Sequence, residues 1–314
     1  MPHGSVALEA GGTNAIGRML GLLGDEWNLL IVQQSVLGAR RYSHFAARLP
    51  ISHAVLANRL RVLTGAELLV HRDGEYLPTA RGRSMWPLLM LIWEWERTWV
   101  SDHAGLLPAM CHSSCGHRFS PVLRCASCQR PASPENVELT LGPSGAWERS
   151  VPVASTRRRS DGQSASFAAA RGAGLFPETM SVLGNRWAAA LLLASFLGLA
   201  RFTDFQTQLG PPPTLLAERL KTFADIGVLC GPDTTKTQRG DYLLTDKGRA
   251  FFGVLLAAVQ WAHRWFAAPD GPAVVARHTD CGRALTAELA CDQCGSRLIG
   301  TDVIVSPAAE SESP

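Results

Sequence analysis

The sequence predicts a mainly α-helical protein with small β elements, built from one folding unit that occurs twice. The first observation behind this prediction is an internal repeat. The pattern between Gly24 and Leu60 returns 160 positions later, and from Tyr76 onward the shift is 166, after a six-residue insertion near 231–240. The second is helical spacing of apolar residues, and the third is a cysteine-rich segment in each copy. A period this long indicates a duplicated domain, because solenoid repeats span only about 20–50 residues.

Composition describes an ordinary globular chain. A length of 314 residues suggests about two domains, and each copy of about 130 residues can bury its own core. Apolar residues make up 46% and charged residues 18%, and the net charge of +3 is too small to imply a partner by itself. The longest apolar stretches fall far short of the roughly 20 residues of a membrane span, and the first residues lack the pattern of a signal peptide. We therefore expect a cytoplasmic protein without a membrane partner.

Each unit is expected to begin with three helices. Apolar residues in 13–23 have the i, i+4, i+7 spacing of an amphipathic helix. They are Ile16, Leu20 and Leu23. A second helix is predicted over about 26–37, where Gly38 ends it, and a short helical segment over 42–49, before Pro50.

A fourth helix, a hairpin and a long helix complete the unit. Ser52 can cap a helix that runs to about residue 64 and buries a leucine stripe. The pair Asp73-Gly74 separates two extended runs and is a strong hairpin signal. A long helix is then predicted over about 80–103, with an apolar stripe formed by Leu88, Ile92, Trp95 and Trp99. This order of elements defines a winged helix-turn-helix domain, so the fold prediction is mainly α with small β wings.

Several runs carry a resemblance to a known family. In copy one they are Leu23-Gly24-Asp25-Glu26-Trp27, Leu37-Gly38-Ala39-Arg40-Arg41-Tyr42-Ser43-His44-Phe45, Val55-Leu56-Ala57-Asn58-Arg59-Leu60 and Leu77-Pro78-Thr79-Ala80-Arg81-Gly82-Arg83. In copy two the wing run is Tyr242-Leu243-Leu244-Thr245-Asp246-Lys247-Gly248-Arg249. Together they resemble the HxlR type of bacterial winged-helix regulators, over about residues 13–103 and 173–268. The resemblance implies a DNA-binding transcription regulator that dimerises through its terminal helices.

In a single chain the two copies could form an intramolecular pseudo-dimer, and further homodimerisation is compatible with the sequence. The expected mode of action is that of a repressor. Several relatives of this type carry a sensing cysteine near the start of the first helix. The matching positions here are Asn14 and Gly174, so thiol-based sensing at that place is not expected.

Residues for DNA contact follow from the leucine stripe, because the opposite face of that helix is free. Polar groups on this face suit major-groove readout, and flanking arginines suit phosphate contacts. The candidates in copy one are Arg40, Arg41, Ser52, His53, Asn58, Arg61 and Arg72. The candidates in copy two are Arg201, Thr214, Lys221, Lys236 and Arg239. The alternative is that these are solvated surface residues. Copy two starts its helix with Pro211-Pro212-Pro213 and lacks the capping oxygen of Ser52, which predicts a weaker reader.

Each copy ends in paired metal-ligand motifs with identical spacing. The residues are His112, Cys115, Cys125 and Cys128 in copy one and His278, Cys281, Cys291 and Cys294 in copy two. Four soft or borderline ligands in each copy predict a closed, structural Cys3His zinc site, two per chain. We expect each copy to form its own zinc-ribbon-like module, closed by an alternating strand near Val137–Leu141 or Val303–Val305. Fortuitous thiols or disulfides are the alternative.

The predicted organisation has six segments. They are a winged helix at 11–105, a zinc-ribbon-like module at 108–142, a flexible linker at 143–172, a second winged helix at 173–268, a second module at 272–307 and a disordered tail at 308–314. No phosphate loop, catalytic triad or open metal site is recognisable, so we expect no enzyme. The expected partner is a double-stranded DNA operator, and a small-molecule effector is compatible with the sequence. The alternative function is a small-molecule-binding protein that holds an aromatic ligand between the tryptophan-bearing helices.

Overall fold

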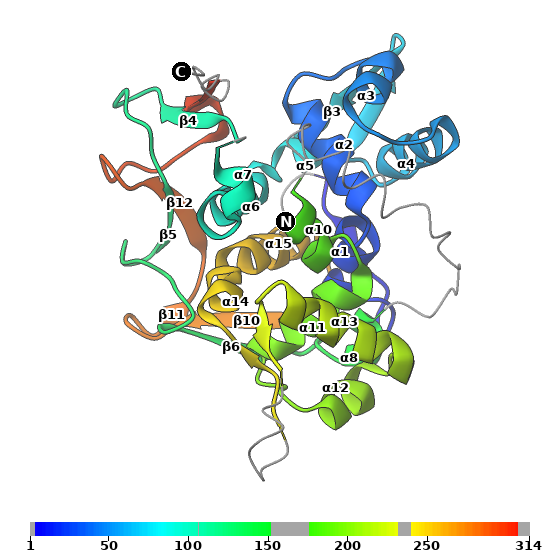
Figure 1. The fold of residues 1–314 in the computed structure, drawn as a ribbon, viewed down its shortest axis with the longest axis vertical. Helices are drawn as coiled ribbons and strands as arrows, with labels where there is room; N and C mark the ends of the chain where they lie inside the picture. The colour runs from blue at the N-terminus through cyan, green and yellow to red at the C-terminus, as the bar shows by residue number, and fades with distance from the viewer. Residues whose placement is uncertain (1–3, 106, 152–175, 232–239, 307–314) are drawn as a thin grey trace.

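Both copies adopt the winged helix-turn-helix fold (Figure 1). The computed structural model describes residues 4–105, 107–151, 176–231 and 240–306. Copy one contains α1 (Ala15–Leu23), α2 (Glu26–Val36), α3 (Tyr42–Arg48), α4 (His53–Gly65), β2 (Leu69–Arg72), β3 (Glu75–Pro78), α5 (Ala80–Arg83), α6 (Trp86–Trp99) and α7 (Ser101–Ala104). Copy two contains α10 (Pro177–Leu183), α11 (Arg186–Phe196), α12 (Phe202–Leu209), α13 (Pro213–Asp225), β7 (Leu229–Cys230), β8 (Leu243–Leu244), α14 (Asp246–Ala250) and α15 (Phe252–Trp265).

The helix starts follow local capping chemistry. The amide of Val55 donates to Oγ of Ser52, which caps α4 as predicted (3.4 Å). Asp25 caps α2 in the same way, and Asn185 caps its equivalent α11. By contrast, α13 has no side-chain cap and begins at Pro213. Proline suits the first position of a helix, because the backbone amide there has no hydrogen-bond partner within the helix. The predicted difference between the two recognition helices is therefore present in the fold.

The predicted long helix at 80–103 is broken into three. A short α5 ends at Arg83, and α6 starts with Pro87 as its second residue. Because proline cannot donate a backbone hydrogen bond, this position favours a new helix start over a continuous helix. Copy two breaks at the matching place, between α14 and α15, although Gly253 stands at the position of Pro87. Proline therefore favours the break in copy one but is not required for it.

The helices α6 and α15 pack against each other and form the centre of the molecule. The contacts across this interface are related by the internal repeat. Nε1 of Trp95 in copy one donates to the carbonyl oxygen of Lys247 in copy two (3.0 Å), and Nε1 of Trp261 donates to the carbonyl oxygen of Arg81 (3.2 Å). The first helix of each copy likewise packs on the last long helix of the other, α1 on α15 and α10 on α6.

Two equivalent glycines allow the copies to approach closely. An added Cβ at Gly24 would lie 2.6 Å from Cα of Arg186, and one at Gly184 would lie 2.8 Å from Cβ of Glu26. Between them, Asp25 and Asn185 form an isolated antiparallel bridge. Asp25 and Asn185 are equivalent positions in the two copies. The contact of Gly24 with Arg186 and the contact of Gly184 with Glu26 are likewise equivalent to each other. The two copies therefore meet around a local pseudo-twofold axis.

The two tryptophans that end the long helices differ in environment. Trp265 is 4% exposed, and its Nε1 donates to Oγ of Ser84 (2.8 Å). Trp99, which the sequence places in the buried stripe, is 36% exposed. The position equivalent to Ser84 in copy two is Ala250, which offers Trp99 no such acceptor. The stripe of α6 therefore ends at Trp95.

The cysteine-bearing segments of the two copies are interlocked. Every long strand in them pairs with a strand of the other copy. The pairs are β4 (Ala109–His112) with β13 (Val303–Ser306), β5 (Pro121–Cys125) with β12 (Ala287–Cys291), and β6 (Val137–Leu141) with β10 (Val274–His278), all antiparallel. Strand β11 (Arg283–Ala284) pairs antiparallel with β10 as a third strand, and a 3-10 turn (Gly300–Asp302) precedes β13. The predicted closing strands exist, but each closes the segment of the other copy.

The start of the predicted linker is packed. Helix α8 (Trp147–Ser150) lies against α1, where Nδ2 of Asn14 donates to the carbonyl of Ser144 and to Oγ of Ser150 (both 2.7 Å). The rest of the linker, with its basic run Arg157-Arg158-Arg159, and the predicted tail lie outside the described residues. A short parallel pair, β1 (Val6–Ala7) with β9 (Phe266–Ala267), ties the N-terminal segment to copy two. Within the described ranges, no helix has the length and apolar character needed to cross a membrane.

Candidate metal centres and nucleic-acid interface

The eight predicted metal ligands form two clusters, and each cluster takes two ligands from each copy. The first contains His112, Cys115, Cys291 and Cys294, and the second contains Cys125, Cys128, His278 and Cys281. The prediction that each copy holds its own set is therefore wrong. The reason is that two copies with identical spacing offer identical half-sites, so spacing alone cannot distinguish pairing within a copy from pairing between copies. The composition of each set, three cysteines and one histidine, is as predicted.

The ligand atoms are spaced as the corners of a zinc tetrahedron. With Zn–S near 2.3 Å and Zn–N near 2.0 Å, neighbouring sulfurs should lie about 3.8 Å apart and a sulfur and a nitrogen about 3.6 Å apart. The Sγ atoms of Cys115 and Cys291 are 4.0 Å apart, and those of Cys125 and Cys281 are 3.9 Å apart. Nδ1 of each histidine lies 3.3–3.5 Å from two of the sulfurs in its cluster. All ligand atoms within a cluster lie within 4.8 Å of one another.

Each ligand pair sits on a tight turn. The residue after the second ligand has positive φ in all four turns: Gly116 (74°), Gln129 (61°), Gly282 (70°) and Gly295 (71°). Glycine adopts this conformation without steric cost, and Gln129 is the one position where a side chain must tolerate it. The four turns therefore have the same backbone shape, which brings both ligands of each pair to one side.

Outer contacts orient the ligands. Nδ1 of His278 faces the sulfurs, while its Nε2 lies 3.2 Å from the carbonyl of Pro131, the kind of second hydrogen bond that fixes a metal-bound imidazole. Hydrogen bonds from the backbone and side chain of Ser296 lower the pKa of the Cys294 thiol to about 6, which favours the thiolate that a metal requires. Cys111, which directly precedes the ligand His112, pairs with Ile304 on the β4–β13 ladder and is in neither cluster.

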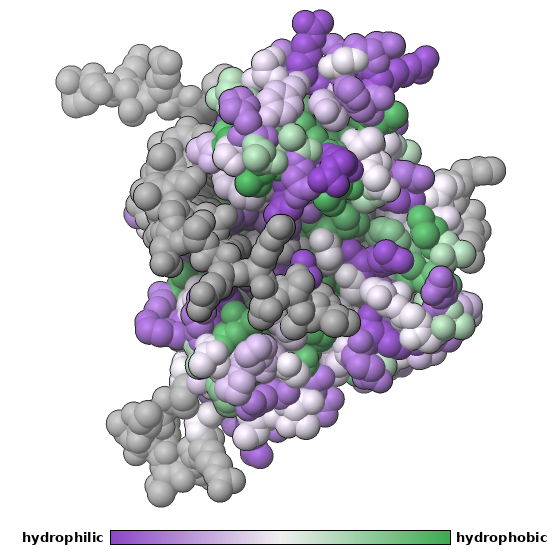
Figure 2. All heavy atoms as spheres, turned by 90° about the vertical axis from the view of Figure 1, so that its right-hand side faces the viewer, coloured by the Kyte–Doolittle hydropathy of each residue, from purple (hydrophilic) through white to green (hydrophobic). Residues whose placement is uncertain are grey.

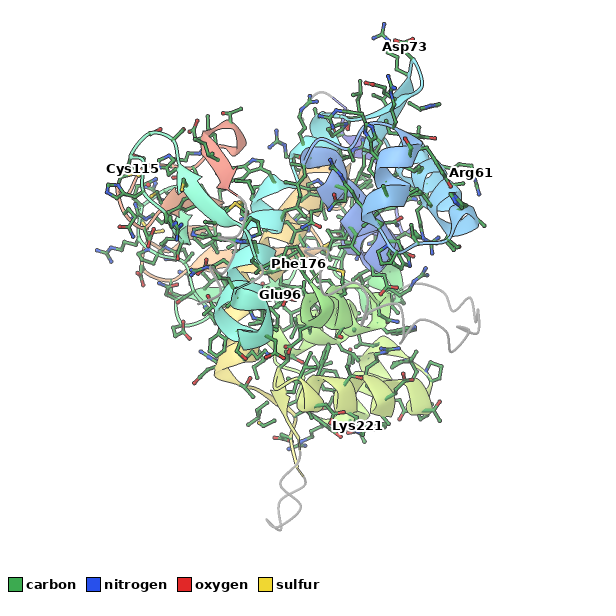
Figure 3. All side chains as sticks on the ribbon, turned by 45° about the horizontal axis from the view of Figure 1, so that its top comes forward. Arg61, Asp73, Glu96, Cys115, Phe176 and Lys221 are labelled. Atoms are coloured by element: carbon green, nitrogen blue, oxygen red, sulfur yellow. The ribbon has the colours of Figure 1, made fainter. Side chains whose placement is uncertain are left out.

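The copy-one reading surface is centred on α4. Asn58 and Arg61 lie on the face opposite the buried leucines, and the Arg61 guanidinium donates to Oδ1 of Asn58. His53 at the start of α4 is exposed and contacts the hydroxyl of Tyr42. Arg41 and Arg72 are exposed next to Glu75 and Asp73 respectively. Figure 3 shows Arg61 and the wing-tip residue Asp73 projecting from this lobe, far from Cys115.

Two arginines near this surface have structural partners. The Arg40 guanidinium donates to the carbonyl of Ser35 in α2 and to the carbonyl of Ala39. A phosphate contact by Arg40 stays a prediction. Arg59 pairs with Asp25, the cap of α2, at 2.6 Å. This ion pair fixes α4 on α2, so Asp25 positions the recognition helix.

Copy two presents a less basic surface. Thr214 and Arg201 are exposed, with Arg201 lying 3.4 Å from Asp241. Lys221 is also exposed but pairs with Asp225 at 2.7 Å. Lys236 and Arg239 lie outside the described residues. In sequence, 40–75 contains six arginines and three acids, whereas the matching 200–241 contains five cations and five acids.

The two recognition helices face the same side of the molecule. In Figure 1, α4 and α13 lie toward the right, and the interlocked strands lie on the left. Figure 2 views that right-hand side directly, and the tip of its upper lobe, formed by copy one, is strongly hydrophilic. The structure therefore defines a tandem winged-helix protein with the two clusters on the side away from the recognition helices.

Comparison with known proteins agrees with this description. The family model of the HxlR-like helix-turn-helix matches twice, at residues 22–104 and 182–270, so the chain belongs to this family. The chain is 30% identical over 129 residues to the uncharacterized HTH-type transcriptional regulator Rv3095 of Mycobacterium tuberculosis, an alignment that covers 41% of this chain and 82% of that protein. It is 33% identical over 95 residues to the uncharacterized HTH-type transcriptional regulator YvaP of Bacillus subtilis, covering 29% and 85%.

The solved structure of PA1607 is 34% identical and covers 40% of this chain and 89% of that one, with a TM-score of 0.37. The family match and the similarity to the HTH-type transcriptional regulators identify a helix-turn-helix transcription regulator rather than an enzyme.

Proposed function

We propose that this protein is a repressor that binds a double-stranded DNA operator with its two winged helices as an intramolecular pseudo-dimer. The observation that carries the proposal is the pair of recognition helices, α4 and α13, held on one side of the molecule by equivalent contacts around the α6–α15 interface. Operator symmetry usually mirrors the symmetry of the protein that reads it, with half-sites about one helical turn apart. A chain that carries both halves can bind without a partner subunit.

The two halves offer different chemistry to DNA. Copy one presents the half-buried Asn58 and the exposed Arg61, which suit adenine and guanine respectively, on a surface with an excess of arginine. Copy two exposes Thr214, Lys221 and Glu218 on a surface with balanced charge. We infer that copy one provides most of the affinity and that the two half-sites differ in sequence.

We also propose that each interlocked cluster binds one structural Zn²⁺. The support is the donor set, three thiols and an imidazole, together with spacings that match a tetrahedron. Four protein ligands leave no position for a catalytic water, so the metal would hold the strands of both copies together and take no part in a reaction.

A gel-shift experiment with the DNA upstream of the protein's own gene tests the regulator proposal. We expect a shift whose affinity falls steeply as salt rises, because phosphate contacts release counterions. The matched measurement uses the same DNA fragment with a protein in which Arg41 and Arg72 are both replaced by alanine. This protein should bind the fragment more weakly and with a shallower salt dependence. If no DNA fragment from that region shifts in low salt, the protein does not bind an operator next to its own gene. If selection in vitro from genomic fragments also yields no bound DNA, the proposal that the protein binds an operator is rejected.

Replacing Arg61 by alanine should relax sequence preference in one half-site only. A bidentate arginine–guanine contact is worth about 1–3 kcal/mol of discrimination, so binding to the matched operator should weaken by roughly ten- to hundredfold. Lys221→Ala is the control at a matching exposed position in copy two, and its effect should fall on the other half-site. Footprints on operators mutated one half at a time would measure both. Equal weakening of both halves by Arg61→Ala would show that two chains bind, each with copy one.

A further inference from the structure

A cavity of about 540 Å3 lies at the seam between the two copies. The start of α6, the second half of α15 and the strands β5 and β12 surround it, and these elements are neighbours in Figure 1. Its floor is buried and apolar, formed by Leu88, Leu91, Trp261, Leu289 and Leu298. The half-buried ring of Trp86 forms part of the wall. The volume lies within the range of about 300–1,000 Å3 that is typical of small-molecule sites. The lining combines this apolar floor with a polar rim.

The equivalent residues on the other side of the pseudo-twofold axis are packed differently. The counterpart of Trp86 is Phe252, which is 3% exposed in a small apolar cluster with Val137 and Leu256. Ala257 and its larger counterpart Leu91 both line this same cavity. The difference between the two sides therefore lies at Trp86, which lines the cavity, and Phe252, which is buried in the other cluster.

The polar groups at this cavity favour an anion. Arg264 is exposed at the rim, and among the described residues no carboxylate pairs with it; its guanidinium lies 5.5 Å from the ring of Trp265. The other rim arginine, Arg297, is already paired with Glu288 at 3.3 Å.

The histidine next to Arg264 is neutral. Nε2 of His263 accepts from the amide of Ala273 (3.2 Å), so the ring proton lies on Nδ1. Burial lowers the pKa of His263 to about 4, which leaves this ring neutral and a donor at pH 7.

We propose that this cavity binds a small aromatic carboxylate, with its ring against Trp86 and Trp261 and its carboxylate on Arg264. Aromatic pairs add to simple burial of apolar area, and the planar guanidinium matches a carboxylate with two parallel hydrogen bonds. Such a ligand touches α6 of copy one and α15 of copy two, the two helices that set the relative position of the recognition helices. Its effect on operator binding rests on the proposed function, but its binding to the cavity does not.

Isothermal titration calorimetry of the full chain with phenylacetate tests the site, and benzyl alcohol serves as the neutral probe. We expect phenylacetate to bind, and Arg264→Gln to weaken it at least about tenfold, as expected for loss of a charged hydrogen bond, with benzyl alcohol unaffected. Arg283→Gln is the matched control, since Arg283 is exposed on the neighbouring β11 and does not line the cavity. Ala257→Phe should fill the cavity and abolish binding of both probes, with thermal unfolding checked by circular dichroism.

The proposal is overturned if phenylacetate gives no binding at millimolar concentration. It is also overturned if Arg264→Gln and Arg283→Gln bind alike, or if folded Ala257→Phe binds as the unaltered protein does. Binding of phenylacetate by a protein that shifts no DNA would keep this site and reject the proposed regulator. A DNA shift without phenylacetate binding would reject this site and keep the proposed regulator.

Discussion

Replacing Trp95 by alanine should destabilise the protein by about 3–5 kcal/mol, the range for truncating a large buried side chain. Trp95 is 3% exposed, and its ring lies edge-on to Phe251 of copy two with centroids 5.0 Å apart. The substitution also removes the donor to the carbonyl of Lys247. Since domains are stable by only about 5–15 kcal/mol, this is a large part of the total. Urea unfolding followed by tryptophan fluorescence and circular dichroism would measure it.

The same substitution should abolish operator binding, because the α6–α15 interface holds α4 and α13 at a fixed separation. Trp99→Ala is the control: it lies one turn further along α6 but is 36% exposed, so its effect should stay within about 1 kcal/mol. Trp261→Ala should have an effect of similar size, since Trp261 is 4% exposed and its indole makes the equivalent hydrogen bond, to the carbonyl of Arg81. A Trp95→Ala protein as stable as Trp99→Ala, with unchanged DNA binding, would contradict the pseudo-dimer.

Local signals in the sequence were sufficient for the winged helices. Ser52 does cap α4, whose buried residues are the predicted leucines, and Asp73-Gly74 does turn the hairpin, with φ of 53° and 77°. These features depend on a few neighbouring residues, so periodicity and capping chemistry determine them. The repeat itself added the expectation that the two copies face each other through their long helices.

Features that depend on distant partners were not predictable in this way. The sequence places Trp99 in a buried stripe, but burial depends on a partner across the interface, and Ala250 provides none. The assignment of metal ligands to sites failed for a related reason. Identical half-sites in both copies leave two pairings that the sequence cannot separate, and only the pairing of strands between copies decides.

The interlocked ligand sets lead to a stoichiometry that distinguishes the two pairings. Cys115 and Cys294 come from different copies but the same cluster, whereas Cys115 and Cys125 come from the same copy but different clusters. If each cluster binds one zinc, the Cys115→Ala/Cys294→Ala protein should lose one site and retain about one zinc per chain. The Cys115→Ala/Cys125→Ala protein should lose both sites and retain none after dialysis against a weak chelator. If the ligands paired within each copy, the Cys115→Ala/Cys294→Ala protein would retain no zinc and the Cys115→Ala/Cys125→Ala protein would retain about one per chain.

Loss of both metals should also have the larger structural effect. Structural zinc sites contribute folding energy directly, with apparent binding free energies of about 10–16 kcal/mol in zinc-finger peptides. The strand pairs β5–β12 and β6–β10 join the copies next to the second cluster, so their amides should lose protection from hydrogen exchange in both copies when Cys125 is replaced. Cys111→Ala is the matched control, because Cys111 neighbours a ligand and belongs to neither cluster; it should keep about two zinc ions per chain. The metal proposal is rejected if metal analysis finds no zinc in unaltered protein purified without chelator or oxidant. The interlocked strands would then be stabilised by backbone pairing and apolar burial alone.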